Sequence, residues 1–370
     1  MSITTAAHTI ALIEGDGIGP EIVAAALPAL EAAAEACGAR LVWRRLDAGT
    51  RAYARSGSSV PPDVLEACRR VRAMLKGPAG LPGVRHADGT EAGTVAGPLR
   101  KAFTLFANVR PVRRLPGIPA LAPEGTDYVI VRENIEGAYA TRGAGEATDD
   151  IAEDRIRITR EGTTRVARLA FDLARQRSAG QTVAAGRTVA AGPRGAADPA
   201  GPRVTCCDKA NVLRSFAFFR RVVGEVADQY PDVAFDAVYA DAAAAAIVDQ
   251  SRRFDVLLAE NLIGDILSDA AAATVGGLGF CPAANVGERH GLFEPVHGSA
   301  PGIAGTDRAN PTAMILAGAM MLEWLGLTEG ADRLRRAVDR VAESGGLGLR
   351  PDGTVASTRA AGRAVLEALR

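Results

Sequence analysis

TIALIEGDGIGPEIVAAALPALEAAAEAC, residues 9–37, is the stretch that decides the fold class. The apolar run at residues 9–13 predicts a strand, the glycines and proline of residues 15–20 predict a turn, and residues 21–37 predict a helix. Apolar runs predict further strands at residues 39–46, 73–75, 128–131, 204–207, 233–239 and 256–258. Because helical stretches separate most of these strands, we expect an α/β fold.

The composition is that of an ordinary soluble chain. Hydrophobic residues make up 48% and charged residues 23%, and 43 basic residues balance 43 acidic ones, so we expect no nucleic-acid partner. The chain shows no membrane span and no signal peptide, and its five cysteines lack paired spacing, so we expect a cytoplasmic protein with reduced thiols. With 370 residues it exceeds the roughly 250 to 300 at which one core stops growing, which predicts two lobes.

Residues 261–269, NLIGDILSD, begin an alanine-rich helix that carries two carboxylates, Asp265 and Asp269. A spacing of four places both on one helix face, within reach of one cation. Taken alone, such a pair is more often a solvated helix face, with Asp265 stabilised by the helix dipole. The neighbouring residues are small or apolar, however, and carboxylates are typical ligands of Mg²⁺ and Mn²⁺, so a divalent metal site is the alternative.

Three arginines, Arg100, Arg110 and Arg132, lie in or beside apolar runs. A guanidinium can bind a carboxylate through two parallel hydrogen bonds, so three of them together fit a substrate with several carboxylates. Each arginine alone is more often part of a structural ion pair, and Glu133 and Glu136 are available to pair with Arg132.

Seven motifs follow one another along most of the chain. They are GDGIGPE at residues 15–21, LKGP at 75–78, FANVRPVR at 106–113, VRENIEG at 131–137, KANV at 209–212, GDILSD at 264–269 and FEPVHGSAP at 293–301. Their identity and order resemble the isocitrate/isopropylmalate dehydrogenase family, the β-decarboxylating dehydrogenases that act on isocitrate, isopropylmalate, homoisocitrate and tartrate. The resemblance extends from residue 10 to about residue 325.

The resemblance implies the two-lobed α/β fold of that family, which is not a Rossmann fold. It implies a large, discontinuous cofactor-binding domain of residues 1–105 and 277–370. Residues 106–276 would form a small domain with the dimer interface and the metal and substrate residues. The protein is then expected to be a homodimer with shared active sites. The glycines of residues 15–19 lack the spacing of a dinucleotide-binding fingerprint, so we expect them only to make a turn.

The resemblance also implies how a substrate is held. Arg100, Arg110 and Arg132 would clamp the carboxylates of a 3-substituted (2R)-malate, and Thr94 would contact its C3 substituent. Ala96 stands where isocitrate enzymes have asparagine, and the paired leucines of isopropylmalate enzymes are absent. This region therefore matches neither pattern, but residues 106–119 look closer to the isocitrate, homoisocitrate and tartrate enzymes than to isopropylmalate enzymes. We expect oxidative decarboxylation of a hydroxy di- or tricarboxylate similar to isocitrate or homoisocitrate. The alternatives are 3-isopropylmalate, an unusual malate such as one with a phosphonate, and, from another class, a regulatory subunit without activity.

The chemistry implied by the resemblance needs a metal ion and two proton-transfer groups. Asp265 and Asp269, joined by Asp241 of the partner subunit, would hold Mg²⁺ or Mn²⁺, which acidifies the C2 hydroxyl and stabilises the enolate. Lys209 of the partner subunit would be the general base at that hydroxyl. Tyr139 would reprotonate the enol. As isolated residues, a surface lysine and a hydrogen-bonded tyrosine are the simpler interpretations.

The resemblance implies that a nicotinamide cofactor lies against Asn211, Glu294, His297, Gly298, Ser299, Ala300, Ile303 and Asn310. NAD-using members usually carry an aspartate at the position of Gly302, but Arg308 is the only evident cation for a 2′-phosphate in that loop. NAD is therefore the expected cofactor and NADP the alternative. Residues 179–202, rich in Ala, Gly and Pro, are expected to form a surface loop.

Overall fold

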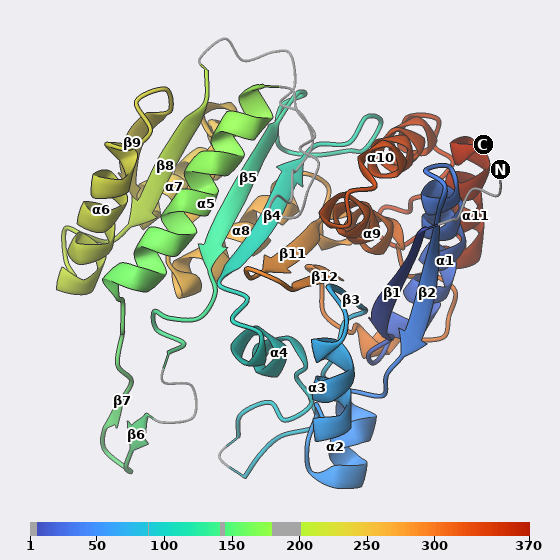
Figure 1. Cartoon of the computed structure of the whole chain (residues 1–370), viewed down its shortest axis with the longest axis horizontal. Helices are drawn as coiled ribbons and strands as arrows, with labels where there is room; N and C mark the ends of the chain where they lie inside the picture. Colours follow the sequence, from blue (N-terminus) through green and yellow to red (C-terminus); the bar gives the residue numbers. More distant parts are fainter. Residues whose placement is uncertain (1–5, 88, 141–144, 180–200) are drawn as a thin grey trace.

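One sheet of ten strands runs through the described part of the chain, residues 6–87, 89–140, 145–179 and 201–370 of the computed structural model (Figure 1). The strand order is β2-β1-β3-β12-β11-β4-β5-β10-β8-β9. The strands are β1 (Ala6–Ile13), β2 (Ala39–Arg45), β3 (Ala73–Lys76), β4 (Ala107–Arg113), β5 (Asp127–Glu133), β8 (Arg203–Asp208), β9 (Ala234–Tyr239), β10 (Val256–Ala259), β11 (Pro282–Val286) and β12 (Gly291–Pro295). A separate ribbon consists of β6 (Glu146–Ala147) and β7 (Ala152–Glu153).

The sheet reverses direction at its centre. Strands β2, β1, β3 and β12 are parallel on one side, and β5, β10, β8 and β9 are parallel on the other. Between them, β11 and β4 pair antiparallel with each other and with their outer neighbours. The strands of residues 6–76 and 282–295 therefore form one half of the sheet, and those of residues 107–259 form the other. The proposed domain boundaries remain a prediction, because the two halves share one continuous sheet.

Helices cover both faces of this sheet. On one face, α1, α9, α10 and α11 pack on the first half, and α5 and α6 pack on the second half. On the opposite face, α3 and α4 cover the first half, and α7 and α8 cover the second half. The helices are α1 (Gly19–Glu35), α2 (Thr50–Ser56), α3 (Pro62–Arg69), α4 (Ala96–Ala102), α5 (Arg160–Ser178), α6 (Arg214–Ala227), α7 (Ala240–Asp249), α8 (Asn261–Thr274), α9 (Thr312–Trp324), α10 (Thr328–Glu343) and α11 (Thr358–Leu369).

Alternation along the central strands directs the polar residues to one face. On β5, Val129 and Val131 join the core beneath α5, whereas Ile130 joins the core beneath α7 and α8. Arg132 is two residues after Ile130, so its side chain lies on the same face of the sheet and points toward α8. On β4, Val109 joins the α5 core, so Arg110 also points toward α8. The two arginines thus emerge side by side on one face of the sheet.

The loop between β1 and α1 is a tight turn that two other motifs cover. Gly15 has φ of 77°, and a Cβ on it would lie 2.0 Å from the Pro78 carbonyl oxygen. A Cβ on Gly17 would lie 1.9 Å from the Ser299 carbonyl oxygen. Only glycine fits at these two positions. These two close approaches agree with the prediction that the glycines make a turn.

The α/β class is confirmed, and a strand or helix is present at each segment for which one was predicted. Helices α9 and α10 pack on α1 and so on the first half of the sheet. Most of the predicted loop at residues 179–202 lies outside the described residues. The five cysteines are free thiols, as expected. No helix in the described ranges is long and apolar enough to cross a membrane.

Candidate active site

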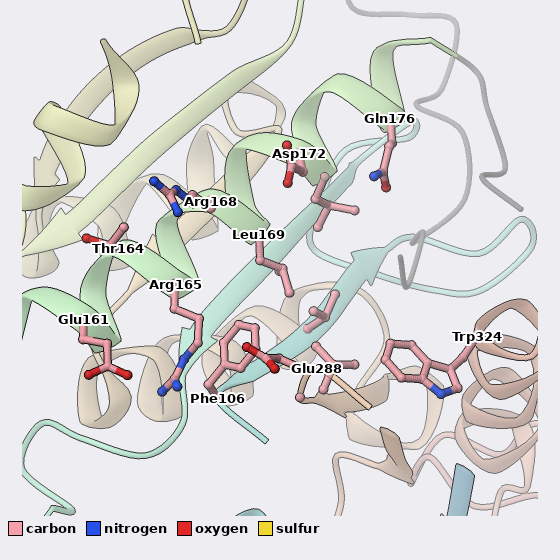
Figure 2. Close-up of a pocket in the computed structure, with 14 residues that line it drawn as sticks. Phe106, Glu161, Thr164, Arg165, Arg168, Leu169, Asp172, Gln176, Glu288 and Trp324 are labelled. Atoms are coloured by element: carbon pink, nitrogen blue, oxygen red, sulfur yellow. The ribbon is translucent and has the colours of Figure 1, made fainter. Parts of the chain in front are cut away.

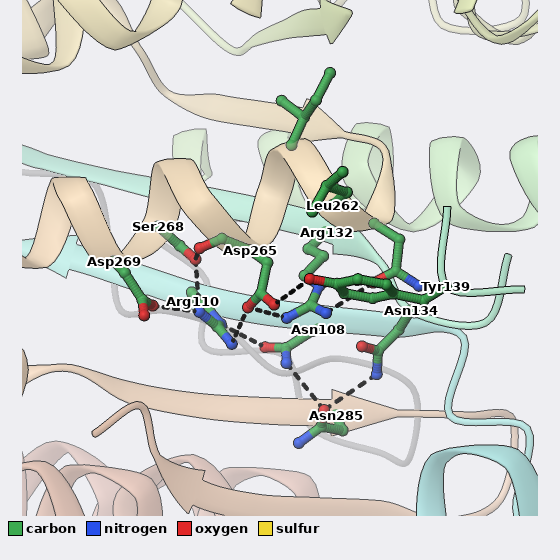
Figure 3. Close-up of polar contacts among 12 residues, drawn as sticks. Asn108, Arg110, Arg132, Asn134, Tyr139, Leu262, Asp265, Ser268, Asp269 and Asn285 are labelled. Atoms are coloured by element: carbon green, nitrogen blue, oxygen red, sulfur yellow. Dashed lines mark hydrogen bonds and ion pairs between the residues drawn. The ribbon is translucent and has the colours of Figure 1, made fainter. Parts of the chain in front are cut away.

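Two arginines at the centre of the sheet meet the two carboxylates of α8 (Figure 3). Arg110 comes from β4 and Arg132 from β5, and both side chains are buried. Glu260 precedes α8 and caps it by accepting hydrogen bonds from two amides of its first turn. The helix therefore begins at a defined residue, and Asp265 and Asp269 face the arginines.

Arg110 joins the two carboxylates. Its Nη1 donates to Asp269 Oδ1 at 2.9 Å and to Ser268 Oγ at 2.6 Å, and its Nη2 lies 3.3 Å from Asp265 Oδ1. Burial raises the pKa of Asp269, the Arg110 charge lowers it, and the Asp265 charge raises it again. The carboxylates thus repel each other, and Arg110 offsets that repulsion. Both keep oxygen surface open to solvent, so their hard oxygen donors fit a divalent cation such as Mg²⁺.

Arg132 contacts Asp265 and the start of α8. Its Nη1 pairs with Asp265 Oδ1, and its Nε and Nη2 donate to Asn261 Oδ1 at 2.9 and 2.7 Å. Its guanidinium also lies 5.6 Å from the centre of the Tyr139 ring. Burial, followed by the charge of Arg100, lowers the pKa of Arg132 to about 9. Arg132 therefore remains a cation at neutral pH.

Tyr139 extends over this cluster from the loop after β5. Its hydroxyl donates to Asp265 Oδ2 at 3.3 Å, and the residue is 40% exposed. Burial and the nearby Asp265 charge raise the pKa of Tyr139. The phenol is therefore protonated at neutral pH and can donate a proton beside Asp265.

Arg100 of α4 approaches the same cluster from the other half of the sheet. Its Nε donates to Asn285 Oδ1 at 2.8 Å, and its Nη2 lies 3.3 Å from Glu294 Oε1. Lys76 Nζ binds the other oxygen of Glu294 at 2.8 Å. Burial would raise the pKa of Glu294, but Lys76 and then Arg100 overcome this effect and hold it at about 2. Burial lowers the pKa of Arg100, the Glu294 charge opposes this effect, and the charge of Arg110 lowers the pKa further.

Asn285 of β11 connects the two halves of this site. Its Oδ1 accepts from Asn108 at 2.9 Å and from Asn134 at 3.1 Å, and its Nδ2 donates to Glu294 at 2.7 Å. None of the three asparagines was predicted to be a site residue. A usable signal was present for two, because Asn108 is two residues before Arg110 and Asn134 is two residues after Arg132, so each shares its arginine's face of the sheet. Asn285 lies on a strand that was not predicted.

Lys209 and Asp241 lie together, at the ends of neighbouring strands. Lys209 follows β8, Asp241 follows β9, and Lys209 Nζ is 2.7 Å from Asp241 Oδ1. The hydrogen bond from Lys209 lowers the pKa of Asp241. Among the described residues, no three His, Cys, Asp or Glu side chains form a metal-binding group, so one chain does not unite Asp241 with Asp265 and Asp269. Asn211 is exposed in the turn after Lys209.

The predicted cofactor loop follows β12 and contains two buried polar atoms without a partner among the described residues. They are His297 Nε2 and Asn310 Nδ2. The other polar atoms of these side chains are engaged, since His297 Nδ1 lies 3.0 Å from the Gly298 carbonyl and Asn310 Oδ1 accepts from the start of α9. Burial lowers the pKa of His297, so it is neutral. A buried acceptor or donor that lacks a partner fits a ligand with polar groups, such as a dinucleotide.

The remaining predicted cofactor residues differ in exposure. Ser299 is buried, and its Oγ donates to the Gly80 carbonyl at 2.5 Å. Ala300 is exposed and has φ of 37°, and Ile303 packs against the core. Both oxygens of Glu294 are already bound to cations, so its contact with a cofactor stays a prediction. Thr94 is half-buried before α4, and its carbonyl accepts from Ser59 at 2.6 Å.

A separate cavity of about 650 Å³ lies on the opposite face of the sheet (Figure 2). It lies between α5 and α9, and Val109 and Val286 are among its lining residues. These valines neighbour Arg110 and Asn285 along β4 and β11, so their side chains point away from the arginine cluster. The cavity is therefore distinct from the candidate active site.

Comparison with known proteins gives one consistent family. Residues 9–189 and 182–359 match the family described as isocitrate/isopropylmalate dehydrogenase. The 3-isopropylmalate/3-methylmalate dehydrogenase of Methanocaldococcus jannaschii is 41% identical, with 91% of this chain and 92% of that protein covered. The 3-isopropylmalate dehydrogenase of Salinibacter ruber is also 41% identical, with 92% and 89% covered. The crystal structure of isocitrate dehydrogenase from Methylococcus capsulatus superposes with a TM-score of 0.84 at 39% identity, covering 98% of this chain and 99% of that chain.

Proposed function

Because this chain belongs to the isocitrate/isopropylmalate dehydrogenase family, we propose that it oxidises and decarboxylates 3-isopropylmalate or a close 3-alkylmalate. One observation carries this proposal: Arg110 and Arg132 pair with the two carboxylates of α8 beside a protonated tyrosine, and Arg100 is linked to Asn108 of the same strand as Arg110 through Asn285. Cations bind the substrate carboxylates, paired carboxylates hold a divalent ion, and a phenol supplies a proton. These are the groups that an oxidative decarboxylation of a malate requires.

The substrate proposal follows the names of the relatives rather than the first expectation from the sequence. An isocitrate- or homoisocitrate-like substrate was expected from residues 106–119, with 3-isopropylmalate as the alternative. Two relatives at 41% identity are named for 3-isopropylmalate, so they favour the alternative. Isocitrate remains the second candidate, because the similar structure from Methylococcus capsulatus is an isocitrate dehydrogenase.

Substrate binding would change the partners of the arginines. Arg110 and Arg132 now direct guanidinium hydrogens at Asp265 and Asp269. In the proposed complex, Asp241 of the partner subunit joins these two aspartates around Mg²⁺ or Mn²⁺, an ion that would polarise the C2 oxygen of the substrate. The arginines would then turn to the substrate carboxylates and bind them through pairs of parallel hydrogen bonds. Arg100 cannot move as freely, because Asn285 and Glu294 hold it.

Two side chains would move protons. Lys209 of the partner subunit would accept the proton of the C2 hydroxyl, and a bound nicotinamide would supply the acceptor for the C2 hydride. Carbon dioxide then leaves C3, and Tyr139 protonates that carbon. The raised pKa of Tyr139 supports this assignment, because the phenol must be protonated before the step.

The exposed apolar residues of the second half support a homodimer. Ile266 on α8 is 61% exposed and Val248 on α7 is 55% exposed, and Leu213 beside Lys209 is also exposed. Exposed apolar side chains gathered on neighbouring elements are typical of an interface. A twofold contact through α7 and α8 would bring Lys209 and Asp241 of each subunit to the other.

The surroundings of Gly302 support NAD as the cofactor. Arg308, the cation available to a 2′-phosphate, is 2.9 Å from Asp352 and also donates to Thr354. In the same region, Glu21 Oε2 accepts the backbone N–H of Asp307 at 3.3 Å, and the Asp307 carboxylate pairs with Arg359. Arg308 and Arg359 are therefore each already paired with a carboxylate, and a 2′-phosphate would have to compete for them.

The test is a panel of initial rates measured by absorbance of the reduced cofactor. The substrates are 3-isopropylmalate, 3-methylmalate, isocitrate, homoisocitrate, tartrate and malate, each with NAD or NADP and with Mg²⁺ or Mn²⁺. The proposal predicts the highest kcat/KM for a 3-alkylmalate with NAD. A higher value for isocitrate would replace the proposed substrate. No turnover of any substrate would favour the non-catalytic alternative.

A further inference from the structure

The residue before Lys209 is a fully buried carboxylate. Asp208 ends β8, is 0% exposed, and accepts the backbone hydrogen bond of Ala210 at 2.8 Å. Its carboxylate therefore shapes the backbone on both sides of Lys209. A buried carboxylate is stable only with a well-placed cation, so whatever neutralises Asp208 also acts on the Lys209 loop.

Arg220 of α6 supplies that cation. Its Nε donates to Asp208 Oδ2 at 2.7 Å and its Nη2 donates to Oδ1 at 2.8 Å, which is the bidentate geometry. The hydrogen bonds to Asp208 raise the pKa of Arg220. The same guanidinium lies over the Tyr239 ring, 4.8 Å from its centre. One side chain thus contacts the ends of two strands.

These two strand ends carry two predicted site residues. Asp208 and Tyr239 are register partners in the parallel pair of β8 and β9. Lys209 directly follows the first, and Asp241 follows the second by two residues, in the first turn of α7. The side chain of Lys209 is 32% exposed and that of Asp241 is 71% exposed. Little packing therefore holds Asp241, and the geometry of the pair depends on how the backbone is fixed beneath both residues.

We propose that Arg220 is a positioning residue that holds Lys209 and Asp241 together as one unit. It does so by tying the end of β8, through Asp208, to the end of β9, through Tyr239. Lysine at position 220 could not replace this arginine, because a single ammonium group cannot bind both oxygens of Asp208 and also stack on the Tyr239 ring. The catalytic role of Lys209 and Asp241 rests on the proposed function, but the effect of Arg220 on their positions can be tested without catalysis.

The test variant is the double substitution Asp208→Asn/Arg220→Met in the full-length chain. Removing both partners leaves no buried charge unpaired, so the fold is retained. The chain offers a matched control in Asp232→Asn/Arg175→Met. Arg175 also forks onto Asp232 and lies 4.2 Å from the centre of the Tyr230 ring, but near the amino end of β9.

The first readout is NMR of the lysine side chains. The chain contains only three lysines, Lys76, Lys101 and Lys209, so each resonance can be assigned by substitution. In the test variant, the Lys209 resonance is expected to shift toward its position in Asp241→Asn, while the other two stay in place. Arg220→Lys is expected to give the same shift, and the control variant none. An unshifted Lys209 resonance in the test variant would overturn the proposal.

The second readout is the pH profile of turnover. The test variant is expected to lower kcat at least about tenfold and to displace its pH profile, because the base is misplaced, with little change in KM. Unchanged kcat and pH profile would overturn the proposal even if the NMR resonance moved. If the unaltered protein turns over none of the substrates, the proposed function fails, whereas the NMR comparison still decides whether Arg220 positions Lys209.

Discussion

Glu294 illustrates how a single buried charge is made stable. Its carboxylate lies between Lys76 and Arg100, and Asn285 donates to one of its oxygens. Lys76 is itself only 3% exposed. Each charge is therefore costly without the other, and the pair fixes β3 to β12 beneath Arg100. Its contact with a cofactor remains a prediction, and its observed contacts support Arg100.

Substituting Glu294→Gln is expected to lower the free energy of unfolding at pH 7 by about 3 kcal/mol, because Lys76 is left buried without a countercharge. The pKa of Glu294 is depressed in the folded protein, from 4.5 to about 2. Its stabilisation is therefore fully present above pH 4.5 and is lost as the pH falls toward 2. Denaturant unfolding between pH 7 and pH 3 measures both effects. If the stability of the unaltered protein and that of Glu294→Gln changed equally with pH, the role given to Glu294 would be contradicted. The control is Glu66→Gln, which removes a carboxylate from an exposed ion pair.

At the scale of elements, the distance between α8 and β5 is set by a glycine. A Cβ on Gly264 would lie 2.8 Å from Arg132 Cβ and 2.9 Å from its Cγ. The helix can therefore approach the strand closely enough for Asp265 to reach Arg132. A side chain at position 264 would push α8 away from the arginines.

The variant Gly264→Ala is accordingly expected to lower kcat/KM at least about tenfold, because a displacement of about 1 Å disturbs the catalytic geometry. The matched control is Gly224→Ala in α6, where an added Cβ would meet only Phe235, at 3.8 Å. That substitution should leave the rate unchanged and stabilise the helix by roughly 0.5 to 1 kcal/mol. Similar rates for the two variants would refute the role given to Gly264.

The strands that periodicity predicted are those with apolar runs, whereas β4 was not predicted because polar residues with a functional role interrupt it. β4 and β11 present Asn108, Arg110 and Asn285 to the candidate site, and β4 also contains Pro111. Alternating apolar and polar residues at the centre of a sheet look like loop sequence when the polar face lines a site. The reversal of strand direction could not be predicted, because no local pattern encodes which strands become neighbours. Asp265, Arg110 and Arg132 were predicted together from their chemistry and from the family motifs.

At the scale of the whole molecule, a single chain divides the predicted catalytic residues between two places. Asp265, Tyr139 and the arginines lie together, whereas Lys209 and Asp241 pair with each other elsewhere. No periodicity in the sequence indicates such a division, and only the family resemblance predicted that a second subunit completes the site. Pairing of two chains is therefore part of the proposed mechanism.

Ile266→Glu tests this pairing. A glutamate buried at a twofold interface is expected to cost roughly 3 to 5 kcal/mol, which would favour monomers without turnover. The control is Leu121→Glu, at a 77% exposed residue between β4 and β5, which should stay dimeric and active. Light scattering and the rate assay on the same samples measure both properties. A monomeric Ile266→Glu protein with full activity would show that each chain contains a complete site.

The most direct measurement is the amount of carbon dioxide released per NADH formed from 3-isopropylmalate in the presence of Mg²⁺. Oxidation at C2 followed by loss of the C3 carboxylate predicts equal amounts of the two products, and Tyr139→Phe should slow the overall reaction. NADH without carbon dioxide would indicate a simple hydroxy-acid dehydrogenase. Neither product, from a folded dimer that turns over isocitrate instead, would contradict the proposed substrate.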